Sequence, residues 1–271
     1  MRHVGSRYTQ NGHESQLELS VKRSWLDVRS DNLAPAMDNS LRLLARTARA
    51  EIESGALRGE ALLQRLLSVP LCDRDVWVDQ LLGIEEAPPD IPDLPRGAVP
   101  YLPCGVEEIL AMVLEAPVHS DDQLVDLGSG LGRALILAHL LSGARASGVE
   151  LQDPLVRGAR ARCAALGLAA VSFVHADAAE VALDGSIFFM YAPCNGQMLR
   201  GVLHRLEEVA RRRPVVVCAA GLEFPDVPWL LARRTSTVAL TLYDSRVCGV
   251  PNRPALDAAA SSPTNPGPTR G

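Results

Sequence analysis

Three glycines stand at alternate positions of the segment 126–133, which reads Asp-Leu-Gly-Ser-Gly-Leu-Gly-Arg. The apolar run before the glycines predicts a strand and the apolar spacing after them predicts a helix, so the glycines form the turn between the two. Glycine lets a backbone turn sharply and lets a ligand approach it closely. Open α/β sheets bind ligands at such turns, beyond the carboxyl ends of their strands. The segment therefore predicts a ligand site formed by Asp126, Gly128, Ser129, Gly130 and Gly132.

Two further carboxylates follow the next two predicted strands. Glu150 closes the strand predicted at 146–150, and Asp177, followed by Ala178, comes after the strand predicted at 171–175. In nucleotide-binding folds, an acid at the first position accepts hydrogen bonds from ribose hydroxyls, and an acid at the second can accept one from an adenine amino group. Because all three features fall at one sheet edge, we predict a nucleotide-type ligand. The alternative is that the glycines only form a turn and that both acids are solvated strand ends.

The spacing of the glycines distinguishes between nucleotides. A dinucleotide-binding loop has the pattern G-x-G-x-x-G and places a pyrophosphate at a helix N-terminus, whereas this loop has the pattern G-x-G-x-G. Asp126 would repel a pyrophosphate but would attract the ammonium group of a methionine tail. The chain also shows no second mononucleotide-binding half. These features favour S-adenosylmethionine over NAD as the cofactor, and a nicotinamide-dependent oxidoreductase is the alternative.

The same residues carry a family resemblance. Val-Asp-Leu-Gly-Ser-Gly-Leu-Gly-Arg at 125–133, with Gly-Val-Glu-Leu at 148–151, resembles motif I and the acid that follows it in class I, seven-strand S-adenosylmethionine-dependent methyltransferases. The non-SET histone-lysine and the ATP-synthase c-subunit lysine methyltransferases look most similar. The second group also has a Tyr/Phe-x-Pro segment before motif I, here Val-Pro-Tyr-Leu-Pro at 99–103. The resemblance covers residues 98–250, and residues 1–97 resemble no family that we can name.

The resemblance implies a role for each matching residue. The loop residues with Asp126 would line the methionine portion of the cofactor, Glu150 would hold the ribose, and Asp177 with Ala178 would meet the adenine. Tyr101 would close over the cofactor, although it is equally explained as an aromatic residue packed on the sheet. The implied cofactor-binding set is Tyr101, Asp126, Gly128, Ser129, Gly130, Gly132, Glu150, Asp177 and Ala178.

The strand predicted at 187–191 ends where a methyl acceptor would sit. Enzymes of this class that methylate nucleobase amines usually have Asp/Asn-Pro-Pro-aromatic at this strand end, whereas this chain has Tyr-Ala-Pro-Cys at 191–194. Methylation of adenine or glutamine nitrogen is therefore disfavoured. Tyr191 and Asn195 are the candidate catalytic or acceptor-contacting residues. Alternatively, Tyr191 is an ordinary strand-end aromatic residue and Asn195 caps the following helix.

The rest of the chain supplies the elements that would position these residues. Apolar spacing predicts helices near 41–52, 62–67 and 78–82, and a proline-rich stretch at 88–103 predicts an extended linker. In the helix near 41–52, the predicted buried face is Leu41, Leu44, Ala48 and Ile52, and Pro103 is placed to enter the first turn of a helix that begins near Val106.

Beyond the linker, apolar strands alternate with helices. This alternation predicts an α/β fold, a Rossmann-like, mostly parallel seven-stranded sheet with helices on both faces, preceded by an N-terminal helical extension. The last two predicted strands, at 231–238 and 240–247, follow a tight connection, so one of them is expected to be antiparallel. The expected organisation is a disordered arm at 1–35, the helical extension with the linker at 36–97, an S-adenosylmethionine-binding methyltransferase domain at 98–253 and a disordered tail at 254–271.

Composition excludes several classes of protein. The net charge of -5 argues against a sequence-independent nucleic-acid binder, which normally carries a basic stripe. The six cysteines have no zinc-ligand spacing, so no metal site is predicted. The N-terminus lacks the apolar core of a signal peptide, and no apolar run reaches the roughly 18 residues of a membrane span. We expect a soluble, cytoplasmic protein.

We interpret the chain as a methyltransferase that acts on an unidentified small molecule or protein side chain. A non-catalytic S-adenosylmethionine-binding module, in which helices in residues 36–83 recruit a partner, is the alternative. In the methyltransferase interpretation the same helices could form a lid or a substrate-selecting cap. The sequence does not determine the acceptor or the oligomeric state.

Overall fold

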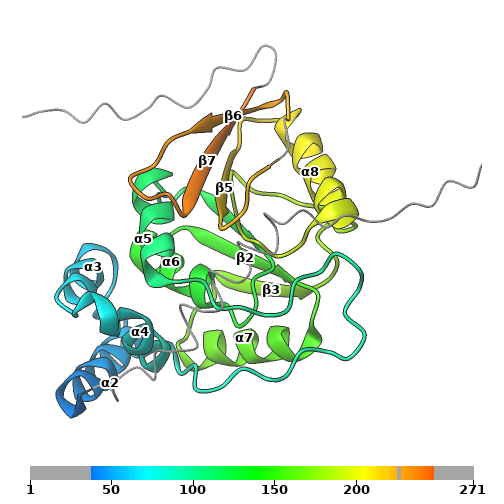
Figure 1. Ribbon diagram of the computed structural model, residues 1–271. Helices are drawn as coiled ribbons and strands as arrows, with labels where there is room; N and C mark the ends of the chain where they lie inside the picture. Colours follow the sequence, from blue (N-terminus) through cyan, green and yellow to red (C-terminus); the bar gives the residue numbers. More distant parts are fainter. Residues whose placement is uncertain (1–37, 225–226, 247–271) are drawn as a thin grey trace, which may run out of the picture. The chain divides into compact units, whose positions relative to one another are not determined.

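The computed structural model describes residues 38–224 and 227–246 (Figure 1). The arm predicted at 1–35 and the tail predicted at 254–271 lie outside these residues. The chain divides into two compact units, Met1–Asn39 and Ser40–Gly271, and the elements described below belong to the second unit apart from the first residue of α2. None of the helices in the described ranges is long and apolar enough to cross a membrane.

Seven strands form one sheet: β1 (Gln123–Leu127), β2 (Arg145–Glu150), β3 (Val171–His175), β4 (Ile187–Tyr191), β5 (Val216–Ala220), β6 (Leu230–Arg233) and β7 (Leu240–Ser245). Their order is β3-β2-β1-β4-β5-β7-β6. Strands β1 to β5 are parallel, and β7 runs antiparallel to both β5 and β6. The predicted Rossmann-like, mostly parallel sheet is confirmed, and the reversed strand is β7. The strand order reverses at β1, the point at which open α/β sheets bind ligands.

The last two strands are shorter than the sequence predicts. The predicted strands 231–238 and 240–247 become β6 and β7, separated by the segment 234–239. In this segment the Thr235 hydroxyl donates to backbone oxygens of Thr237 and Leu240. Local side-chain hydrogen bonds of this kind compete with strand pairing, which explains why β6 ends at Arg233.

Helices cover both faces of the sheet, as predicted. On one face, α8 (Gly196–Ala210) contributes Val202 and Leu206 to a buried cluster with Val125, Phe188 and Val217 of the strands. The helices α6 (Arg133–Ser142) and α7 (Asp153–Ala165) each connect two adjacent parallel strands, and the right-handed crossover usual for such connections places both on the other face. There α6 contacts β1, β2 and β3, and α7 contacts β2 and β3. Because helices pack on both sides, β5 is buried along its whole length.

The N-terminal extension consists of α2 (Asn39–Glu53), α3 (Gly59–Leu67), the 3₁₀ turn η1 (Leu71–Asp73) and α4 (Arg74–Leu82). It packs against the sheet-covering helices, with α3 against α6 and α4 against both α6 and α5 (Val106–Glu115). Figure 1 shows these blue and cyan helices grouped beside α5 and α6. The extension is therefore joined to the helical layer next to the first strand.

Two local expectations about these helices are only partly met or fail. In α2, Ala48 and Ile52 are buried as predicted, but Ala45 is buried in place of Leu44, which is 45% exposed. Pro103 does not enter the first turn of α5, since the helix begins at Val106. The Val106 amide donates to the Asp75 carboxylate of α4 at 2.9 Å, so a distant residue marks the start of α5.

The buried face of α2 leads to a stability prediction. Ile52→Ala should lower the free energy of unfolding by about 2–5 kcal/mol, because Ile52 is fully buried. Leu44→Ala should change it by about 0.5 kcal/mol or less, because the side chain is largely solvated. Chemical denaturation of both variants measures the difference, and equal losses would contradict the packing described here.

Candidate cofactor site

The glycine loop connects β1 to α6 through three left-handed residues. Gly128, Gly130 and Gly132 have φ angles of 85°, 51° and 82°, values that side-chain-bearing residues rarely adopt. Protein atoms also fill the space beside each glycine. An added Cβ would lie 2.3 Å from Pro193 at Gly128, 2.2 Å from the Tyr101 ring at Gly130 and 2.6 Å from Phe173 at Gly132. The sequence predicted these glycines for ligand approach, but the turn and the packed side chains already require them.

The amides of this loop donate to acceptors within the protein. The Gly128 and Ser129 amides donate to the carbonyl oxygen of Val149 at 2.8 and 3.1 Å, and the Gly132 amide donates to the oxygen of Ser129 at 2.8 Å. The Gly130 amide donates to the Glu150 carboxylate at 2.8 Å. In a phosphate-binding loop the amides point at the ligand instead. This loop therefore does not form a pyrophosphate cradle.

Two carboxylates are buried beside the loop. Asp126 is 3% exposed and Glu150 is 7% exposed. Burial, and then the nearby Glu150 charge, raise the pKa of Asp126 to about 8. Burial also raises the pKa of Glu150, although hydrogen bonds from the Gln152 and Gly130 amides oppose that shift. Buried acids with raised pKa values mark places that favour a cation or a functional role.

Asp177 lies farther along the same edge of the sheet. One of its carboxylate oxygens accepts a hydrogen bond from the Ala179 amide at 2.8 Å. Burial raises the pKa of the Cys194 thiol to about 11, and the Asp177 charge adds to this shift. Ala178 is half-buried and packs against the cluster under α8. The Asp177 carboxylate therefore bonds within the turn that follows β3, whereas Ala178 contributes to packing.

The proline-rich segment 84–104, which we call the strap, does more than link α4 to α5. It is the long loop between these helices in Figure 1. Asp90 accepts hydrogen bonds from the Tyr101 amide at 2.9 Å and from the Gln152 side chain at 2.7 Å. The Ile91 amide donates to the same Gln152 side chain at 2.9 Å. The backbone amide of Gln152 donates to the Glu150 carboxylate at 2.8 Å. The strap is therefore attached next to Glu150, the acid that is predicted to hold the ribose.

The strap is attached a second time at the end of β4. Ala98 and Cys194 form an isolated antiparallel bridge. The Val99 amide donates to the Pro193 oxygen at 3.0 Å, and the Asn195 amide donates to the Gly97 oxygen at 2.8 Å. The strap thus spans from the acid at the end of β2 to the predicted acceptor end of β4.

Tyr101 lies on the glycine loop. Its ring contacts Gly130, and the Leu131 amide lies close enough to the hydroxyl to affect its ionisation. Burial raises the pKa of Tyr101 to about 12, and the positive charges of Arg133 and Arg162 lower it only in part. The Tyr101 ring therefore packs on the glycine loop, and not on the sheet as the alternative from the sequence expected.

The predicted acceptor end of β4 has a strained backbone. Ala192 has a φ of 40°, an uncommon value for a residue with a side chain, and it precedes Pro193, which disfavours helical conformations. Strain of this kind is found preferentially at functional sites. Tyr191 is half-buried at the strand end, and an added Cβ on Gly221 would lie 3.7 Å from its ring. Asn195 is exposed and is the N-cap residue of α8, as the capping alternative expects, although its side chain makes no capping hydrogen bond.

The sequence analysis missed three residues of this arrangement. Asp90 and Gln152 connect the strap to β2, but nothing in the local pattern indicates a contact between positions so far apart. Arg133 follows the last glycine and is 4% exposed. A cation in the first turn of a helix opposes the helix dipole, and this signal could have indicated a buried partner.

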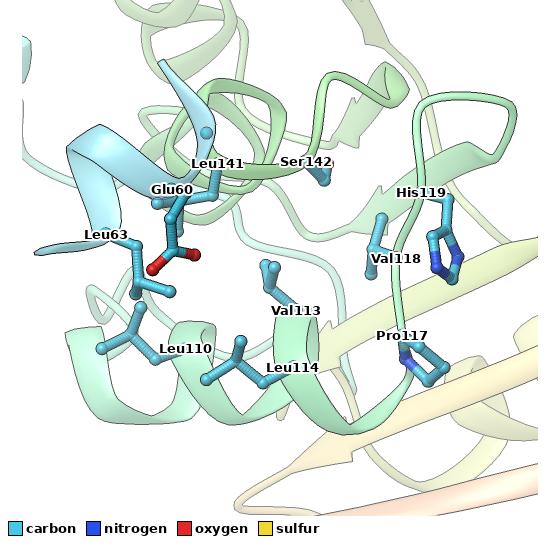
Figure 2. A pocket seen from close by; sticks show the side chains of 11 residues that line it. Glu60, Leu63, Leu110, Val113, Leu114, Pro117, Val118, His119, Leu141 and Ser142 are labelled. Atoms are coloured by element: carbon cyan, nitrogen blue, oxygen red, sulfur yellow. The ribbon is translucent and has the colours of Figure 1, made fainter. Parts of the chain in front are cut away.

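Within the described residues, no group of three His, Cys, Asp or Glu side chains is arranged to hold a metal ion. A hollow of about 250 Å³ lies between α3, α5 and α6, and Figure 2 shows the side chains around it. Its lining is largely aliphatic, with Glu60 and His119 as its titratable groups. The hollow borders the C-terminal end of α6, at Leu141 and Ser142, whereas the glycine loop precedes the N-terminal end. It is therefore separate from the candidate cofactor site.

No protein-family model and no curated protein sequence matches this chain. Among solved structures, an RNA methyltransferase from Salinibacter ruber in complex with S-adenosyl-L-homocysteine is 26% identical, with a TM-score of 0.39, over 53% of this chain and 92% of that one. A SAM-dependent methyltransferase from Thiobacillus denitrificans, also bound to S-adenosyl-L-homocysteine, is 21% identical, with a TM-score of 0.36, over 43% and 49%. One from Geobacter sulfurreducens with the same ligand is 24% identical, with a TM-score of 0.36, over 42% and 47%. At these low scores, function has to be inferred from the residues of the site itself.

The contact between Tyr101 and the loop gives a second stability prediction. Gly130→Ala should destabilise the protein more than Gly167→Ala, because both glycines are left-handed but only Gly130 has a side chain in its path. We expect about 1–2 kcal/mol for the left-handed alanine in both variants and about 1–3 kcal/mol more for the overpacking at Gly130. Denaturation curves measure both values. Adding Tyr101→Ala to Gly130→Ala should recover the steric part, and no recovery would contradict the contact.

Proposed function

We propose that this protein is an S-adenosylmethionine-dependent methyltransferase. The observation that carries the proposal is the pair of buried carboxylates, Asp126 and Glu150, beside a glycine loop whose amides donate within the protein. S-adenosylmethionine bears an ammonium and a sulfonium group, so buried negative charge complements it. A dinucleotide bears a pyrophosphate, for which this loop offers repulsion and few free donors. The proposal therefore favours a cationic nucleoside over NAD.

Each acid has a role that its surroundings support. Asp126 would pair with the ammonium group of the methionine portion. Glu150 would accept hydrogen bonds from the ribose hydroxyls: its two oxygens each accept one amide, and an ionised carboxylate has about four acceptor positions. Asp177, at the same edge, would accept from the adenine amino group. Tyr101 would shift from Gly130 or lie alongside the bound methionine portion.

The protein's part in the reaction would be alignment. When bound, the cofactor supplies an activated methyl group, so the side chains need only orient the two reactants and exclude competing nucleophiles. The acceptor would enter beside the end of β4, where Tyr191 and Asn195 are the candidate contacts. Within this class, the resemblance to lysine methyltransferases favours a protein amine as one acceptor, and a small molecule is the other. The net charge of -5 and the motif departure at β4 disfavour a nucleic acid, and the expected location is the cytoplasm.

A non-catalytic S-adenosylmethionine-binding or partner-recruiting module is the second candidate. The observation that favours it is that Tyr101 and Pro193 already fill the space beside Gly130 and Gly128. Incubation with labelled cofactor and host lysate separates the candidates. A methyltransferase should yield a labelled product, whereas a binding module should take up the cofactor and transfer nothing.

Calorimetry with S-adenosylhomocysteine and with NAD tests the cofactor assignment. We expect binding of the first ligand only. Asp126→Asn should weaken binding by about tenfold or more, since it removes a charge-assisted contact. The matched control is Asp122→Asn, which changes another buried acid, just before β1 at the opposite end of that strand, and should leave affinity unchanged. The assignment is abandoned if S-adenosylhomocysteine gives no binding signal in the wild-type protein.

The raised pKa of Asp126 predicts a pH dependence of binding. Below about pH 8, Asp126 of the ligand-free protein is largely protonated, and an ammonium ligand favours the ionised form. Binding must then release a proton, so affinity for S-adenosylhomocysteine should rise as the pH increases toward the pKa. Calorimetry in two buffers of different ionisation enthalpy measures the released proton. A flat profile, or one that persists in Asp126→Asn, would count against this role.

A further inference from the structure

Arg133 is the first residue of α6 and follows the last glycine of the loop directly. Its side chain is almost completely buried, at 4% exposure. A cation in this position faces the positive end of the helix dipole and loses its hydration. Such a residue is retained only where several acceptors compensate for both effects.

The acceptors come from α4 and from the end of the strap. One terminal nitrogen of Arg133 donates to the Cys104 oxygen at 2.7 Å, and the other donates to the Asp75 backbone oxygen at 2.8 Å and carboxylate at 2.9 Å. The Nε atom lies 3.1 Å from the Asp79 carboxylate. Asp75 in turn accepts the first amide of α5. Arg133 therefore joins α4, the end of the strap and the start of α6.

This junction is close in sequence to the residues of the cofactor site. Cys104 ends the strap three residues after Tyr101, whose ring lies on Gly130, and Arg133 follows Gly130 by three residues in the other segment. Holding Cys104 against Arg133 therefore fixes the strap and the glycine loop relative to one another. The planar guanidinium suits this task, because its two terminal nitrogens donate in fixed directions to Cys104 and Asp75, whereas a compact ammonium group does not match this geometry.

We propose that Arg133 is a positioning residue, which holds Tyr101 on the glycine loop by fixing the end of the strap, and which requires α4 as its partner. The N-terminal extension is then an obligate part of the cofactor site. The proposal rests on the proposed function for its binding effect, but the placement of the strap can be measured without any ligand.

The test compares Arg133→Lys with Arg74→Lys. Arg74 is also an α4 crosslink: its guanidinium contacts Glu107 at 2.7 Å and the Val69 and Leu67 oxygens, each at 3.2 Å, but neither the strap nor the loop. In the ligand-free protein, Arg133→Lys should speed amide hydrogen exchange in the strap and at Gly130, and Arg74→Lys should not. Arg133→Lys should also weaken the binding of S-adenosylhomocysteine by about tenfold, which is the loss expected for charge-assisted hydrogen bonds.

A double-mutant cycle shows whether Arg133 acts through Tyr101. If it does, Arg133→Lys should weaken binding of S-adenosylhomocysteine far less in a Tyr101→Ala background than in the wild type. Additive losses would overturn the positioning role. If the wild-type protein itself does not bind the ligand, the proposed function fails, and hydrogen exchange still decides this proposal: equal exchange of the strap in Arg133→Lys and wild type would overturn it.

Discussion

The candidate cofactor site depends on two acidic side chains, Asp126 and Glu150, which are buried together where β1 and β2 end. Asp126 and Glu150 lose most of their hydration, and the charge of Glu150 adds to the cost of ionising Asp126. The fold offsets this for Glu150 with amides from the glycine loop and from Gln152. No amide among the described residues compensates Asp126 in this way, so its carboxyl group stays largely protonated below its raised pKa of about 8. A positively charged ligand would favour its ionised form.

The strap is positioned by a small number of directional contacts, because its prolines have no N–H to donate. Its remaining amides are used at defined places, with Ile91 on Gln152, Val99 on Pro193 and Tyr101 on Asp90. A segment without regular structure thus borders the candidate site across the ends of β2 and β4. It connects the predicted cofactor acids to the predicted acceptor end, so a substitution at one of these places should affect the other.

The glycine loop shows how one sequence feature can serve several physical requirements. Its left-handed φ angles favour glycine. The side chains of Pro193, Tyr101 and Phe173 also pack against the loop and leave no space for a Cβ atom there. Its amides bond inward, which leaves the acids, rather than the backbone, to recognise a ligand. This distinguishes the loop from a phosphate cradle and is the physical basis for preferring a cationic nucleoside.

The sequence by itself determined the features that are local in the chain. The strands β1, β3 and β4, the glycine turn and the acids that follow the strands each come from a short pattern of burial or backbone constraint. Tertiary structure decided what depends on partners distant in the chain: the buried face of α2, the Tyr101 ring on Gly130, the Asp90 contact with Gln152, and the α4 acceptors of Arg133. Periodicity cannot specify such pairs, because a side chain's partner is set by how whole elements pack and not by its neighbours in sequence.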